Sequence, residues 1–335
     1  MSSSIPSTQH AVVVKEVGGP EVLEYHTDVA IPALKEGQVL VKNTVSGVNF
    51  VDTYYRSGFY KSEKPEILGR EGAGVIVALG PKTAPYNFAV GDRVLWLGIS
   101  GYAQYSTPDA AKVMKLPSGV SEEDAGACAL PGLTALTIVE ESYKVQAGEW
   151  VLVHAAAGGV GVLLTQILKR LGAKIIATAG GPEKVALVKS LGADHVIDYR
   201  SPKGQDWVAQ VKSITGGHGV DVVYDSVAKD TWEGSLESVR RKGTIVWFGN
   251  ASGPVPPLTL HRIAIKCVKI VRPTLFGYIE TREELEYYTA KLFDLLTAKD
   301  KLKLFIHKVY PLEDVGQAHI DLTSRKTTGK LLLKP

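Results

Sequence analysis

Cysteine is scarce in this sequence. The 335 residues include 2 cysteines, Cys128 and Cys267, too few for a disulfide framework or for a metal site of four thiolates. The sequence also lacks any run of about 18 uninterrupted apolar residues, the length of a membrane-spanning helix. Its start, MSSSIPSTQH, has no basic stretch followed by an apolar one, as a secretory signal would have. We therefore expect a cytoplasmic protein with a short frayed N-terminus and no membrane segment.

An excess of charge of one sign is missing as well. The chain has 38 Lys and Arg against 35 Asp and Glu, a formal net charge of +3. This balance argues against a dedicated nucleic-acid-binding protein, which would gather basic residues on one face. Hydrophobic residues make up 45% and charged residues 22%, as is typical of globular proteins. The length predicts two domains.

Short apolar runs broken by glycine and proline fill the chain from Val12 to about Met114. Examples are QVLVKNTVSGVNF, GAGVIVALG and GDRVLWL. Short strands separated by frequent turn signals predict a barrel-like β domain.

From Glu149 onward, apolar strands alternate with amphipathic helices. Strands are expected at EWVLVHA, AKIIATA, DHVIDY, VDVVYD, GTIVWFG and CVKIVRP. Helices are expected after Gly159, Pro182, Lys203 and Asp230. Because parallel neighbouring strands need crossover connections, this order predicts a doubly wound parallel sheet with helices on both faces.

The end of the chain returns to shorter elements. After Pro273, apolar residues at helical spacing predict a helix in TREELEYYTAKLFDLLTA, namely Leu285, Tyr288, Leu292 and Leu295. The segment is too short to bury a large core of its own, so we expect it to complete the N-terminal domain. The predicted fold is a mixed α/β protein with a β-rich domain of residues 1–130 and 273–335, and a cofactor domain of residues 131–272.

The stretch HAAAGGVGVLLTQ joins a predicted strand to a predicted helix. Its small residues fall as Ala156-x-Gly158-x-x-Gly161, with Gly159 and Val160 between the last two. In a dinucleotide-binding turn the middle glycine lets the backbone approach a pyrophosphate, and the last lets helix and sheet pack closely. A plain tight turn is the alternative. The strand–helix alternation that follows favours dinucleotide binding.

The choice of coenzyme depends on the end of the next strand. Proteins that bind NAD place an acid there to hold the ribose 2′-hydroxyl, whereas KIIATA runs into Ala179, Gly180 and Gly181. Lys184, at the start of the following helix, would attract an adenosine 2′-phosphate. These residues predict NADPH rather than NADH.

With these residues in view, the chain resembles the zinc-free, zeta-crystallin-like quinone oxidoreductases of the medium-chain dehydrogenase/reductase superfamily. The likeness runs from GGPEVL through GVNFVDTYYRSGFY, HAAAGGVG, VVYDSV, FGNASG and RPTLFGYI to TTGKLLL. It implies a GroES-like N-terminal domain, a Rossmann domain, a cleft at their junction as the active site, and a homodimer.

The resemblance also implies site residues. It assigns the pocket for nicotinamide and substrate to Asn49, Asp52, Tyr54 and Thr134. It assigns the remaining cofactor contacts to Gly158, Gly159, Val160, Lys184, Tyr199, Phe248, Asn250 and Arg325, beside Ala156 and Gly161 of the glycine turn. Lys184, Tyr199 and Arg325 would surround the 2′-phosphate.

A catalytic zinc is not expected. Related alcohol dehydrogenases hold zinc with a cysteine and a histidine where this chain has Ser46 and Arg70. Glu71 remains, but one carboxylate does not replace the three protein ligands of a catalytic zinc site. The eight histidines form no local ligand pair, so we predict no metal.

Metal-free hydride transfer suits an electron-poor acceptor. A quinone gains aromaticity on reduction, so positioning beside the coenzyme carries much of the catalysis. We expect NADPH to reduce a quinone or enone, with Asn49 and Tyr54 orienting the ring and hydrogen-bonding its oxygen, and water as the final proton source. Alternatively, Tyr54 lines the wall of the pocket and has no catalytic role.

Other functions stay open at this point. Reduction of a 2-alkenal or related enone is a close alternative. A short-chain dehydrogenase would use Tyr-x-x-x-Lys, which occurs at Tyr60 and Lys64 and again at Tyr287 and Lys291. The resemblance also allows RNA binding regulated by NADPH, although the basic segments near Arg240 and Lys301 read as solvated faces. A structural lens-type role would predict coenzyme binding without turnover.

Overall fold

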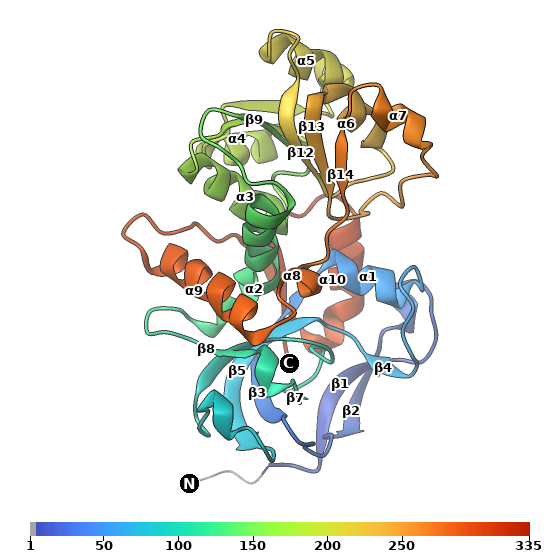
Figure 1. Ribbon diagram of the computed structural model, residues 1–335. Coiled ribbons are helices and arrows are strands. Elements are labelled where there is room, and N and C mark those ends of the chain that lie inside the picture. The colour runs from blue at the N-terminus through green and yellow to red at the C-terminus, as the bar shows by residue number, and fades with distance from the viewer. Residues whose placement is uncertain (1–4) are drawn as a thin grey trace. The chain divides into compact units, whose positions relative to one another are not determined.

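The computed structural model describes residues 5–335, so the first residues of the predicted frayed N-terminus lie outside the described range. The chain forms two compact units. Unit 1 comprises Met1–Leu130 and Thr281–Pro335, and unit 2 comprises Pro131–Glu280. The chain thus re-enters unit 1 at Thr281, a little after Pro273, where the sequence predicts the return. Figure 1 shows the elements of each unit by label.

Unit 1 is built on β-sheets. Within the described residues, one sheet has three strands in the order β2-β1-β4 and another has seven, along the path β15-β16-β3-β5-β6-β8 with β7 on β3. The strands are β1 (Thr8–Val14), β2 (Glu24–Ala30), β3 (Val39–Val48), β4 (Glu66–Ile67), β5 (Glu71–Leu79), β6 (Arg93–Leu97), β7 (Tyr105–Ser106), β8 (Val113–Lys115), β15 (Ile306–Pro311) and β16 (Lys330–Lys334). The β-rich character agrees with the short strands predicted for this part.

The C-terminal strand of the chain completes the N-terminal sheet. β16 pairs antiparallel with β3, so that Leu332 faces Gly47 and Leu333 faces Ser46. Both leucines are fully buried. Because consecutive residues of a strand point to opposite faces, both faces of β16 are covered at this point. This pairing brings Lys330, at the start of β16, to the end of β3.

Helices cover parts of unit 1. They are α1 (Phe50–Arg56), α9 (Arg282–Thr297) and α10 (Val315–Thr323). The predicted helix after Pro273 is α9, which begins with a capping box of Thr281 and Glu284. Its buried apolar residues are Leu285, Tyr288, Leu292 and Leu296. Leu296 takes the place predicted for Leu295, because it lies four residues after Leu292 on the same face.

Unit 2 is a parallel sheet flanked by helices. Within residues 131–280 its six strands follow the order β11-β10-β9-β12-β13-β14, which is the 3-2-1-4-5-6 order of the Rossmann fold. The strands are β9 (Trp150–Val153), β10 (Lys174–Ala179), β11 (His195–Asp198), β12 (Val220–Asp225), β13 (Val239–Trp247) and β14 (Lys269–Val271). All neighbouring pairs are parallel, which confirms the predicted doubly wound sheet.

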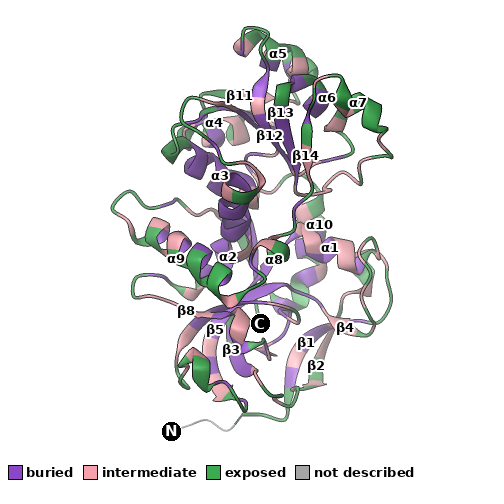
Figure 2. Ribbon diagram, viewed as in Figure 1, coloured by how far each residue is buried: buried purple, intermediate pink, exposed green. Residues whose placement is uncertain are grey.

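The helices of unit 2 follow the predicted crossovers. They are α3 (Gly159–Arg170), α4 (Pro182–Ser190), α5 (Trp207–Ile214), α6 (Trp232–Ser238), α7 (Leu260–Ala264) and α8 (Leu275–Tyr278), and α2 (Glu122–Thr137) runs into this unit from unit 1. The central strands are buried while α7 is exposed (Figure 2). No helix within residues 5–335 is long and apolar enough to cross a membrane.

Candidate active site

The glycine turn follows β9 in unit 2. A side-chain Cβ on Gly161 would lie 2.5 Å from the Ala155 carbonyl oxygen and 2.6 Å from Ala156 Cα, so only glycine fits there. Gly158 is the N-cap of α3 in an extended conformation. The first N–H groups of a helix have no partner within the helix and carry partial positive charge. The turn therefore offers bare backbone and N–H groups where a pyrophosphate of a dinucleotide would bind.

Tyr199 and Arg200, which directly follow β11, lie against Gly180, which follows β10. A Cβ on Gly180 would lie 2.6 Å from the Tyr199 hydroxyl and 3.0 Å from Arg200 Nε. Asp198 Oδ1 holds this arrangement, since it accepts hydrogen bonds from the backbone N–H groups of Gly181, at 2.9 Å, and Arg200, at 3.0 Å. A carboxylate is thus present, at the tip of β11 rather than β10, and it is bonded to the turn itself.

Lys184 lies in the first turn of α4 and is half-buried. Burial lowers the pKa of its ammonium, and the positive charge of Arg200 lowers it further. Two cations therefore face the same region beyond β10, where the adenosine ribose lies in this fold. The sequence prediction missed Arg200. Arg200 could have been found from the sequence, because it is a basic residue directly after Tyr199.

The other predicted cofactor residues are spread over both units. Phe248 and Asn250 follow β13, at the same carboxyl edge of the sheet as the glycine turn. The Phe248 N–H donates to the Asp225 carbonyl at 3.0 Å, and the Asn250 side-chain oxygen accepts from Arg272 Nη2 at 2.9 Å in the amide orientation that satisfies both its atoms. Thr134 is buried on α2. Arg325 belongs to unit 1, just after α10, so its part in phosphate binding stays a prediction.

Asn49 connects β3 to α1 in unit 1, and both ends of its amide are bonded. Its Nδ2 donates to Glu71 Oε1 at 2.7 Å, and its Oδ1 accepts from Lys330 Nζ at 2.5 Å. Lys330 Nζ also lies 2.5 Å from Glu71 Oε1. The Lys330 and Glu71 side chains are 4% and 0% exposed, so this is a buried ion pair. It fixes the orientation of the Asn49 amide.

Asp52 lies in the first turn of α1 and is fully buried. Its Oδ2 accepts the Asn49 N–H and the Tyr102 hydroxyl, both at 2.8 Å. Within residues 5–335, its Oδ1 has no hydrogen-bond partner. Burial raises the pKa of the Asp52 carboxyl to about 6, against the opposing effect of the two hydrogen bonds and of the charges of Lys330 and Arg70. Both of these hydrogen bonds come from protein groups, so Asp52 positions Asn49 and Tyr102.

Tyr54 belongs to an aromatic cluster with Phe59 and Tyr60. The Tyr54 ring lies edge-on to Phe59 at 5.5 Å and to Tyr60 at 5.2 Å, and Phe59 and Tyr60 stack at 5.2 Å. Phe59 is 44% exposed although it is a large apolar residue. An aromatic cluster with one exposed ring can accept a flat ring by stacking. Phe59 and Tyr60 were not predicted as site residues, although they stand in the motif that contains Tyr54.

The positions related to zinc ligands are occupied by other interactions. The Ser46 hydroxyl donates to the Gly101 carbonyl, and the Arg70 guanidinium lies 3.8 Å over the Tyr55 ring. Glu71 binds Asn49, Lys330 and, through Oε2 at 2.7 Å, the Leu130 N–H. A hydroxyl, a guanidinium and a fully bonded carboxylate do not fit zinc. No group of three His, Cys, Asp or Glu residues able to hold a metal ion occurs in the described chain.

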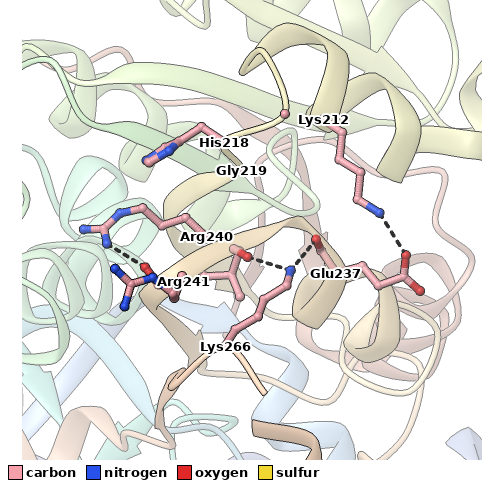
Figure 3. Close-up of a pocket in the computed structure, with 9 residues that line it drawn as sticks. Lys212, His218, Gly219, Glu237, Arg240, Arg241 and Lys266 are labelled. Atoms are coloured by element: carbon pink, nitrogen blue, oxygen red, sulfur yellow. Dashed lines mark hydrogen bonds and ion pairs between the residues drawn. The ribbon is translucent and has the colours of Figure 1, made fainter. Parts of the chain in front are cut away.

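A basic cavity of about 410 Å³ lies at the opposite edge of the unit 2 sheet, where β12 and β13 begin (Figure 3). Three of the cations that line it have protein partners. Lys212 pairs with Glu237 at 3.2 Å, and Arg240 pairs with Asp221 at 2.5 Å. Lys266 donates to backbone carbonyls at the end of α6. Arg240 and Lys266 therefore bind within the protein, and RNA binding stays an alternative that these contacts do not test.

Comparison with known proteins places this geometry in a family. Residues 35–129 match the alcohol dehydrogenase GroES-like domain, and residues 159–292 match the zinc-binding dehydrogenase family. A probable quinone oxidoreductase of Schizosaccharomyces pombe is 41% identical over 96% of this chain and 96% of its own. A 2-haloacrylate reductase of Burkholderia is 35% identical, covering 97% of this chain and 98% of its own.

A solved structure agrees with this similarity. The crystal structure of Escherichia coli quinone oxidoreductase complexed with NADPH has a TM-score of 0.92 and 40% identity, covering 97% of this chain and 100% of that one. The alternative of a short-chain dehydrogenase is therefore wrong, and Lys64 of its Tyr-x-x-x-Lys match is paired with Glu66. The chain belongs to the quinone oxidoreductase family of the medium-chain dehydrogenase/reductase superfamily.

Proposed function

We propose that this protein is an NADPH-dependent quinone reductase that transfers hydride without a metal. The observation that carries the proposal is the glycine turn at the start of α3, where Gly161 admits no side chain, together with the cations Lys184 and Arg200 beyond β10. Together they suit a phosphorylated dinucleotide. The family membership and the similarity to an enzyme whose structure contains NADPH support the same coenzyme.

The coenzyme would be held by groups at the carboxyl edge of the unit 2 sheet. Backbone N–H groups of the turn would bind the pyrophosphate, and Lys184, Tyr199 and Arg200 would bind the 2′-phosphate. The proposed set, which carries the sequence predictions forward, is Thr134, Ala156, Gly158, Gly159, Val160, Gly161, Lys184, Tyr199, Phe248, Asn250 and Arg325, with Arg200 added.

The quinone would meet α1 and the segment after it. We propose that the Tyr54 hydroxyl hydrogen-bonds a quinone oxygen and that Phe59 offers its exposed ring for stacking. Because Glu71 and Lys330 already bind both ends of the Asn49 amide, we propose that Asn49 chiefly shapes the start of α1. Asp52 holds Asn49 from the other side.

The main task of these residues in the reaction is to position the coenzyme and the quinone. When bound, NADPH supplies a hydride, and one proton from solvent completes the reduction of a quinone to a hydroquinone. Orientation of two reactants can lower a barrier by about 7–11 kcal/mol. The quinone has conjugated carbonyls and becomes aromatic on reduction, so hydrogen bonding at its oxygen replaces the Lewis acid of zinc enzymes.

Reduction of an activated alkene is a second candidate function. The similarity to a 2-haloacrylate reductase, at 35% identity, favours it, because conjugate addition of hydride to an enone has the same electronic demand. Rates of NADPH oxidation with 1,4-quinones, 1,2-quinones, 2-alkenals and 2-haloacrylate distinguish the two. Quinones should give the highest kcat/KM, and a preference of more than tenfold for the alkenes would reassign the substrate.

Two substitutions test the proposed substrate residues. Tyr54→Phe and Asn49→Ala should each lower kcat/KM for quinone while the Kd for NADPH stays unchanged. If both variants keep kcat/KM within twofold of the unchanged protein, the roles given to Tyr54 and Asn49 are wrong.

A homodimer in the cytoplasm completes the proposal. Both cysteines are free, Cys128 buried and Cys267 exposed, which suits a reducing compartment. Sedimentation of the purified protein tests the dimer. RNA binding regulated by NADPH would require RNA to be displaced by the coenzyme and to bind more weakly as salt rises.

A further inference from the structure

A chain of buried hydrogen bonds runs beneath α1 in unit 1. Arg56 Nη1 lies 3.1 Å from His319 Nδ1, and His319 Nε2 lies 3.0 Å from the Tyr102 hydroxyl. The Tyr102 hydroxyl lies 2.8 Å from Asp52 Oδ2. Arg56 is 8% exposed and the other three are fully buried. The chain joins both ends of α1 to α10 and to the loop after β6.

The donor and the acceptor of each hydrogen bond between Arg56 and Asp52 follow from the chemistry of the side chains. Arginine only donates, so His319 Nδ1 must accept. His319 is then neutral with its hydrogen on Nε2, in agreement with burial, which together with the charge of Arg56 lowers its pKa to about 3. Its Nε2–H donates to the Tyr102 oxygen, and the Tyr102 O–H is left to donate to Asp52.

This directionality gives the chain an electrostatic effect. Asp52 Oδ2 receives two hydrogen bonds, from Tyr102 and from the Asn49 N–H, and hydrogen bonds to a carboxylate favour its ionised form. Arg56 cannot release a proton, so the chain does not conduct protons from its far end. It is a fixed array of dipoles aimed at Asp52.

We propose that Tyr102 and His319 are positioning residues, which keep Asp52 ionised and so hold Asn49 and the start of α1 in the geometry used for quinone reduction. This inference rests on the proposed function, because the geometry matters through Asn49 and Tyr54. It adds residues from two distant segments that the sequence did not associate with the site.

Other charges also face this chain. Lys330 and Arg70 face Asp52, Glu71 faces Tyr102, and Glu21 faces Arg56. The substitution must therefore alter one hydrogen bond and no charge. Tyr102→Phe removes only the hydroxyl, which withdraws a hydrogen bond from Asp52 and leaves His319 Nε2–H without its acceptor.

The pH dependence of kcat/KM for quinone is the readout. The unchanged protein should lose activity as the pH falls through about 6, where Asp52 takes up a proton. Loss of one hydrogen bond to the carboxylate should raise this midpoint by about one unit. Tyr102→Phe should then reduce kcat/KM about fivefold at pH 6 and less than twofold at pH 8, through KM for quinone and with the Kd for NADPH unchanged.

Tyr310→Phe is the matched control. Tyr310 is also buried in unit 1 and donates to an aspartate, Asp321, at 2.6 Å, but this pair does not reach Asn49. The control should keep the pH midpoint of the unchanged protein. An unchanged midpoint in Tyr102→Phe, or an equal change in both variants, would overturn the inference.

A second variant keeps the test decisive if Tyr102→Phe folds poorly. His319→Gln replaces the imidazole by an amide, whose N–H can still donate to the Tyr102 oxygen, and removes the Nδ1 acceptor that faces Arg56. It should move the midpoint in the same direction by a smaller amount. An unmoved midpoint in a folded His319→Gln protein would overturn the inference. Absence of quinone reduction in the unchanged protein would instead refute the proposed function.

Discussion

The two cations beyond β10, Lys184 and Arg200, lead to a quantitative prediction about coenzyme choice. Lys184 is half-buried and close enough to Arg200 for the charge of Arg200 to lower its pKa. A 2′-phosphate bound beside both cations would offset their mutual repulsion. The 2′-phosphate distinguishes NADPH from NADH, so neutralising either cation should weaken the use of NADPH and leave that of NADH unchanged.

The two cations should contribute unequally. A hydrogen bond to a charged group contributes about 1.5–3 kcal/mol, and Lys184, half-buried, should lie near the lower end of this range. Arg200 is exposed, so solvent screening limits it to about 0.2–1 kcal/mol. At about 1.4 kcal/mol for each factor of ten, Lys184→Gln should raise KM for NADPH about tenfold or more, and Arg200→Gln at most about fivefold.

The assay compares kcat/KM for NADPH and NADH in each variant with one quinone. Lys189→Gln, an exposed lysine in the last turn of the same helix, is the control and should change neither value. The NADPH preference should also fall as ionic strength rises, since salt screens exposed charges. An unchanged ratio of NADPH to NADH in both Lys184→Gln and Arg200→Gln, or an equal loss with both coenzymes, would refute the reasoning.

Three further predictions concern packing, substrate stacking and metal. Gly161→Ala should lower the free energy of unfolding by about 1–3 kcal/mol and weaken NADPH binding, because its Cβ would lie 2.5 Å from the Ala155 carbonyl oxygen. Thermal unfolding measures the first effect and coenzyme titration the second. A variant with unchanged stability and normal binding would contradict the packing argument. Phe59→Ala should raise KM for quinone severalfold and leave KM for NADPH unchanged in steady-state kinetics; an unchanged quinone KM would remove Phe59 from the site. Dialysis against a strong chelator should leave kcat unchanged, since Ser46 and Arg70 do not fit zinc; a loss restored by zinc would contradict the metal-free account.

The fold of unit 2 could be predicted because its signals are local. Most strands are short apolar runs rich in β-branched residues, and each crossover begins near a glycine, a proline or a polar residue. The glycine turn was recognisable for the same reason. In a helix the side-chain register is less certain from sequence, as shown by Leu296, which is buried where Leu295 was expected.

The contacts that shape the α1 region could not be predicted in this way. Lys330 meets Glu71 across 259 positions in the chain, and Arg56 meets His319 across 263. Such pairs depend on how β16 adds to β3 and how α10 packs near α1, and no periodic pattern records them. Asp52 was predicted as a site residue from resemblance alone, and the structure supplies the physical reason for its burial and its partners.

The most direct test of the central claim is anaerobic oxidation of the coenzyme by the purified protein, followed by absorbance at 340 nm with a 1,4-quinone. The account predicts that one NADPH is consumed for each quinone reduced, that NADH is used far less well, and that chelator has no effect. No quinone-dependent consumption of NADPH, or equal use of both coenzymes, would contradict it.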